Sequence, residues 1–105
     1  MATSKAFHDY VTECLKSAAG GITTRKMMGE YCVYCREKII GLICDNILYL
    51  KITPSTEKLL ADCGKSYPYD GSKTLMHEVC DFENIRLMSE VINALYAELP
   101  DKRKK

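Results

Sequence analysis

The chain has 105 residues, of which 47% are hydrophobic and 28% are charged, and its formal net charge is +1. This length fits one domain, and the composition is typical of a globular protein, which argues against disorder. The near-neutral charge argues against direct nucleic-acid binding, and no apolar run approaches the roughly 20 residues that span a bilayer.

The two ends of the chain predict little structure of their own. The N-terminal segment MATSKAFHDY lacks the apolar core of a secretory signal, so we expect a cytoplasmic protein. At the other end, residues 101–105 form a basic tail (DKRKK) after a single predicted domain of residues 1–100. A run of charge at a terminus is usually a solvated end, and we interpret this tail in that way.

The first predicted element is a helix over residues 5–18 with Thr3 or Ser4 as its N-cap. Its apolar residues recur at helical spacing, and the Gly20-Gly21 pair ends it because glycine readily adopts the left-handed conformation. Residues 22–24 are predicted to be a short linker.

Residues 25–52 are predicted to form three successive β-strands joined by two tight turns, because the hydrophobic period changes there to two. Asp45 and Asn46 both tolerate positive φ and predict a two-residue hairpin turn. This turn would place three pairs on the core face: Ile43 with Leu48, Gly41 with Leu50, and Ile39 with Ile52.

The first of the two turns is constrained by Arg36. A two-residue loop at positions 37–38 would place Arg36 on the core face, which is costly. The pattern therefore favours a three-residue loop over residues 36–38. That loop pairs Cys35 with Ile39, Val33 with Gly41, and Tyr31 with Ile43.

The opposite face of these strands is also apolar, although two-layer antiparallel sheets usually leave that face wet. A second copy of the chain is the simplest cover, so we expect a homodimer or another protein partner. A terminal helix or tail is the alternative cover. The residues predicted on this face are Cys32, Tyr34, Ile40, Leu42, Cys44, Ile47 and Tyr49.

The remaining elements complete the predicted fold. A second helix begins at Thr53-Pro54 and ends at Gly64, and a third, capped by Asp81, covers residues 82–99 before Pro100. Between them we predict strands at 67–69 and 74–79 with a turn at Asp70-Gly71. The order α-β-β-β-α-β-β-α predicts an α+β two-layer sandwich with one mainly antiparallel five-stranded sheet.

The cysteines do not form a recognisable reactive motif. Cys32 and Cys35 lie in a predicted strand and therefore point to opposite faces, and no second pair completes a zinc site. We interpret all six cysteines as free packing residues and expect no enzymatic activity, cofactor or metal. The alternative is a small-molecule- or metal-binding thiol protein, because the chain also contains His8 and His77.

Tyrosines are frequent in the central strands. Tyr31, Tyr34 and Tyr49, with Lys51 and Arg36 nearby, superficially resemble the aromatic platforms that stack single-stranded bases. Tyrosine is also an ordinary packing residue of sheets. We therefore favour packing or a protein interface over nucleic-acid binding.

Several segments resemble the N-terminal domain of the TfoX (Sxy) family: RKMMGEY at 25–31, Val33-Tyr34, LYLK at 48–51, YPY at 67–69 and MHEV at 76–79. The resemblance covers residues 5–99. Full-length members have a further helical domain, and no counterpart follows Leu99, so we expect a stand-alone form. The resemblance implies a regulator of competence for DNA uptake that acts with transcription machinery rather than as an enzyme. It also marks seven candidate interaction or motif residues: Arg25, Met28, Gly29, Tyr31, Tyr34, Tyr49 and Lys51.

Overall fold

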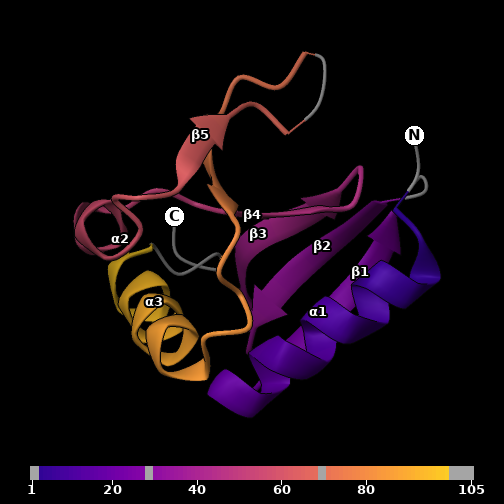
Figure 1. Ribbon diagram of the computed structural model, residues 1–105, viewed down its shortest axis with the longest axis horizontal. Coiled ribbons are helices and arrows are strands. Elements are labelled where there is room, and N and C mark those ends of the chain that lie inside the picture. The colour runs from indigo at the N-terminus through magenta and orange to yellow at the C-terminus, as the bar shows by residue number, and fades with distance from the viewer. Residues whose placement is uncertain (1–2, 28–29, 69–70, 100–105) are drawn as a thin grey trace.

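The computed structural model of the chain describes residues 3–27, 30–68 and 71–99 (Figure 1). Over these residues the fold is α+β, as predicted, with antiparallel pairing between all neighbouring strands. The sheet has six strands in the order β1-β2-β3-β4-β6-β5, so the prediction of five was wrong. The elements are α1 Lys5–Ala18, β1 Ile22–Met27, β2 Glu30–Cys35, β3 Lys38–Cys44, β4 Ile47–Leu50, α2 Pro54–Leu59, β5 Gly64–Ser66, β6 Met76–Val79 and α3 Ile85–Glu98.

The extra strand is β1, which replaces the predicted linker at residues 22–24. Ile22 is buried and pairs with Cys35, and the pairing continues along the strand to Met27 opposite Glu30. The β-branched residues of this segment suit a strand. The segment from Arg25 to Cys35 is therefore two strands. The two residues between them, Met28 and Gly29, lie outside the described residues.

The hairpin turn at Asp45 and Asn46 is confirmed, with φ of 53° and 59°. These values fit the primed turns that two-residue hairpins prefer. The predicted pairs of Ile43 with Leu48 and Gly41 with Leu50 are present. The third pair is absent because β4 ends at Leu50, two residues before Ile52.

The first turn differs from the predicted one. Cys35 pairs with Lys38 rather than Ile39, so the loop contains two residues, and Arg36 adopts a φ of 60°. The sheet register then shifts, because Val33 still pairs with Gly41 while Tyr34 pairs with Ile39. This β-bulge turns Ile40 into the helix-side core, where it is fully buried, instead of the opposite face.

Element ends elsewhere were only partly predicted. The bounds of α1 and its Ser4 cap are confirmed, whereas α2 ends at Leu59 rather than at Gly64. The strand predicted at 67–69 lies instead at Gly64–Ser66. The cap of α3 is Asn84, whose side chain accepts a hydrogen bond from the Leu87 amide at 3.1 Å, rather than Asp81. Part of the predicted turn at Asp70-Gly71, Pro100 and the tail lie outside the described residues.

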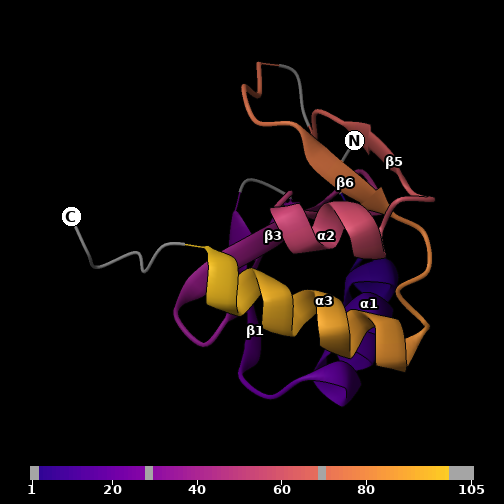
Figure 2. The same cartoon turned by 90° about the vertical axis from the view of Figure 1, so that its left-hand side faces the viewer.

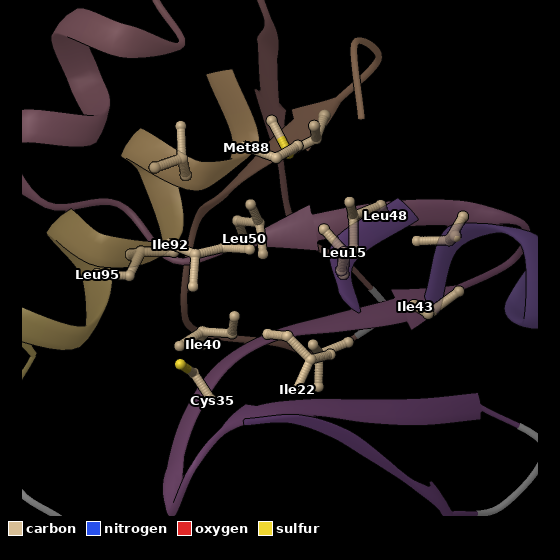
Figure 3. Packing of buried hydrophobic residues seen from close by; sticks show 14 of the residues in the cluster. Leu15, Ile22, Cys35, Ile40, Ile43, Leu48, Leu50, Met88, Ile92 and Leu95 are labelled. Carbon is tan, nitrogen blue, oxygen red and sulfur yellow. The ribbon is translucent and has the colours of Figure 1, made fainter. Parts of the chain in front are cut away.

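The helices pack against one side of the sheet, as Figures 1 and 2 show. The main core lies between them and the strands, and Figure 3 shows Leu15 of α1 and Ile92 of α3 directed toward Leu48 and Leu50 of β4. All four of these side chains are fully buried. This one-sided arrangement leaves the other face of the sheet without a helix over it.

His77 of β6 is a polar member of this interior. Its side chain is fully buried, and its Nε2 lies 3.0 Å from the Thr56 hydroxyl of α2. Burial lowers the pKa of His77 below its usual value of 6.5, mainly because a charged imidazole would lose its hydration. The folded state therefore favours neutral His77.

This histidine should make stability fall on acidification. Below about pH 6.5 the unfolded chain binds a proton at His77 that the folded chain does not take up, so the free energy of unfolding decreases as pH falls. In urea titrations at pH 7.5 and 5.5, His77→Gln should show a smaller pH-dependent loss than the wild type. Equal losses in the two proteins would contradict this assignment.

Candidate functional site

The face of the sheet opposite the main core is called here the second face. It is formed by alternate residues of the strands, and the register fixes which side chains share it. Most of the residues that the sequence predicted there are present, with Ile39 in place of Ile40 after the bulge. Its members include Thr23, Arg25, Cys32, Tyr34, Ile39, Leu42, Cys44, Ile47, Tyr49, Met76 and Glu78.

One row of paired residues crosses this face from β1 to β6. Arg25 pairs with Cys32, Cys32 with Leu42, Leu42 with Tyr49, and Tyr49 with Glu78. The row follows the strands labelled β1, β2, β3 and β4 in Figure 1 and ends on β6. It thus begins with a cation, has an apolar middle and ends with an anion.

The middle of the second face is a compact apolar cluster of its own. Cys44, Tyr49 and Met76 are buried, and the half-buried Leu42 and Ile47 pack against them. Burial raises the pKa of the Tyr49 phenol. Leu42 and Ile47 are the members of the cluster that retain surface for a further contact.

Arg25 and Tyr34 meet at the β1 end of the face. They line a shallow pocket of about 430 Å³ together with Thr23, Thr24, Arg36 and Glu37. Arg36 also lies with its guanidinium 5.1 Å from the centre of the Tyr96 ring. Two guanidinium groups beside hydroxyl groups suit the binding of a carboxylate. Arg36 is not among the seven residues that the family resemblance marks, and its place beside Arg25 in this pocket depends on the extra strand β1.

Glu78 occupies the other end of the row on β6. Its carboxylate accepts a hydrogen bond from the Ser66 hydroxyl of β5, and the residue is half-exposed. It pairs with Gly64 on its outer side, where there is no side chain to cover it. The alternation of side chains along the segment MHEV at 76–79 could have indicated that Glu78 faces away from the main core.

Tyr31 does not belong to this surface. Its ring stacks on His8 of α1, with centroids 3.9 Å apart and planes 21° apart, on the helix side of the sheet. The Nε2 atom of His8 in turn lies 2.7 Å from the Thr24 hydroxyl. Tyr31 therefore attaches α1 to the sheet.

Lys51, another predicted residue, follows β4, and its amide donates a hydrogen bond to the Ile40 carbonyl at 2.9 Å.

The cysteines lie on both sides of the sheet. All six are free thiols, and Cys32 lies on the second face while Cys35 is part of the main core, as predicted for a strand. Within the described ranges no three histidine, cysteine or acidic side chains group as metal ligands. No helix in the same ranges is long and apolar enough to cross a membrane.

Fold and surface together define an α+β domain with helices on one side of an antiparallel sheet. The other side is an apolar face with a charged residue at each end. The chain belongs to the TfoX N-terminal domain family, whose model matches residues 13–100. A curated relative from Spirochaeta aurantia, described as an uncharacterized 12.7 kDa protein in the trpE 5' region, is 38% identical over 48 residues. That match covers 46% of this chain and 42% of the relative. No solved structure matches the chain.

Proposed function

We propose that the chain is a non-enzymatic regulatory domain that acts through protein contacts, the first of them with a second copy of itself on the second face. The main support for this proposal is the row from Arg25 through Leu42 to Glu78, because its ends are oppositely charged and its middle is apolar. A closed twofold dimer requires a surface that is complementary to itself.

The geometry of the row fits a face-to-face dimer. A twofold axis parallel to the strands and through the middle of the row would place Arg25 of each copy opposite Glu78 of the other. Neighbouring strands lie about 4.8 Å apart, so the two charged ends are separated by about 19 Å along the row. The charged pairs would then form a polar rim around an apolar centre at Leu42, which is the usual anatomy of an interface.

The regulatory part of the proposal rests on membership of the TfoX N-terminal domain family. We extend it to a role related to competence, with transcription machinery as a further partner of the dimer. The six free thiols are in keeping with a cytoplasmic location, because the cytosol keeps thiols reduced.

Leu42→Arg tests the interface. The wild type should be a dimer by size-exclusion chromatography with light scattering, and the variant a monomer, because an arginine at the centre of an apolar contact would be buried without a partner charge. Ile85→Arg is the matched control, since Ile85 is 38% exposed at the start of α3, away from the second face. It should remain dimeric.

Circular dichroism must show that both variants are folded before the masses are compared. A wild type that stays monomeric across the accessible concentration range would contradict the proposal. So would a folded Leu42→Arg variant that dimerises as tightly as the wild type.

A further inference from the structure

Two free thiols lie next to each other at one end of the β5–β6 hairpin. The Sγ atoms of Cys63 and Cys80 are 3.7 Å apart, which is within contact distance but longer than the roughly 2.05 Å of a disulfide. Cys63 directly precedes β5, and Cys80 directly follows β6. No other pair of sulfur atoms shows such a contact among the described residues.

The backbone already holds these two positions together. Gly64 pairs with Glu78 in the antiparallel ladder of β5 and β6, so the residues flanking this pair leave the sheet at the same end. The register continues to Cys63 opposite Val79, so Cys80 lies one residue further along and the two sulfur atoms meet just beyond the end of the ladder. Formation of the disulfide has to bring the two sulfur atoms from 3.7 Å to about 2.05 Å.

The two thiols differ in access to solvent. Cys80 is exposed and lines a pocket of about 350 Å³ with Phe7 and Phe82. Cys63 is half-buried and packs against the main core. An oxidant from solution therefore reaches Cys80 first.

We propose that Cys63 and Cys80 are a redox pair that closes to a reversible disulfide when a low-molecular-weight disulfide reacts with the protein. The Cys80 thiolate attacks one sulfur of that disulfide, which forms a mixed disulfide and releases one small thiolate. Cys63 then gives its proton to water, and its thiolate attacks the Cys80 sulfur, which forms the intramolecular bond, breaks the mixed disulfide and releases the second small thiolate, which takes up a proton from water. The two cysteines lose two electrons, and the small disulfide gains them.

The order of attack follows from the surroundings of each sulfur. Burial raises the pKa of the Cys63 thiol, so this group is mostly protonated and reacts slowly with an oxidant in solution. Its attack on Cys80 becomes fast only when the mixed disulfide forms beside it, because the two sulfurs are already in contact. Cys80 is the attacking thiol and Cys63 the resolving thiol.

The disulfide would close a loop from residue 63 to residue 80, and this loop includes both strands at this edge of the sheet. A cross-link of this loop length constrains the unfolded chain and should raise the thermal midpoint on the order of 10 °C. The disulfide would therefore stabilise β5, the three-residue edge strand. Glu78 of the second face lies within the same loop.

The test uses glutathione disulfide as the probe, on the reduced 105-residue chain. After incubation, peptide mapping without reduction should identify a bond between Cys63 and Cys80 in the wild type, with little retained glutathione. Cys63→Ser should instead accumulate glutathione on Cys80, because the resolving thiol is missing. Cys80→Ser should react much more slowly. Cys14→Ser is the control, since Cys14 is a half-buried thiol on α1, and it should behave like the wild type.

The outcomes separate the proposal from general thiol reactivity. A wild type that keeps glutathione on Cys80 to the same extent as Cys63→Ser would overturn it, as would cross-links that involve other cysteines. The thermal midpoint is an independent readout. It should be higher for oxidised than for reduced wild type, whereas Cys63→Ser should show no such rise because it cannot form the cross-link.

Discussion

Replacement of Gly41 by alanine is expected to lower the free energy of unfolding by about 3 kcal/mol, because the added methyl group has no space. A Cβ at this position would lie 2.1 Å from the Tyr49 carbonyl oxygen and 3.1 Å from the Leu50 Cα. Both are backbone atoms of β4 and cannot move aside as a side chain would. Relief of the clash requires β3 and β4 to separate, which breaks the ladder that aligns Leu42 with Tyr49.

Gly20→Ala is the matched control for this prediction. No heavy atom of the surroundings lies within 4 Å of the Cβ that it would add. Its effect on urea-induced unfolding should stay within about 0.5 kcal/mol of the wild type. If Gly41→Ala and Gly20→Ala unfolded at the same urea concentration, the close contact between β3 and β4 would be wrong.

Features that depend on neighbouring residues could be predicted from the sequence. The apolar stripe of α1 and its Ser4 cap are local patterns, and so is the tolerance of Asp45 and Asn46 for positive φ. The hairpin register between β3 and β4 follows directly from that turn. These elements are confirmed because each is determined within a few residues of chain.

Other features depend on contacts that short patterns do not contain. The residues 22–24 look like a linker, and they form a strand only because β2 offers them a partner. The bulge that turns Ile40 into the core and shortens the first loop results from competition between two pairing registers. Neither the strand β1 nor the bulge can be predicted from the alternation of apolar and polar residues alone.

The candidate site likewise combines residues that local patterns predict with residues that only distant contacts bring together. Arg25, Tyr34 and Tyr49 were predicted as surface or motif residues, and the structure places all three on the second face. The position of Glu78 at the end of the row requires knowledge that β6 lies between β4 and β5, which joins segments far apart in the chain. The contact between Cys63 and Cys80 also depends on this insertion, and no sequence motif indicates it.

Charge reversal at the ends of the row should disrupt and then restore dimerisation. In the proposed dimer, Arg25→Glu would place each new glutamate opposite Glu78 of the second copy, so attraction would become repulsion at two symmetric positions. We expect the dissociation constant to rise about tenfold or more at low salt, and the effect to weaken as salt screens these rim charges. Glu78→Arg should act in the same way by placing arginines opposite Arg25.

The most direct test of the proposed dimer is sedimentation equilibrium of the wild type, Arg25→Glu, Glu78→Arg and the double variant that exchanges both charges. Each single variant should dissociate, and the double variant should recover most of the wild-type dimer, because opposite charges face each other again. Recovery requires that positions 25 and 78 meet across the interface. If the double variant is as monomeric as the single variants, or if none of the changes alters the association, the second face is not the dimer interface.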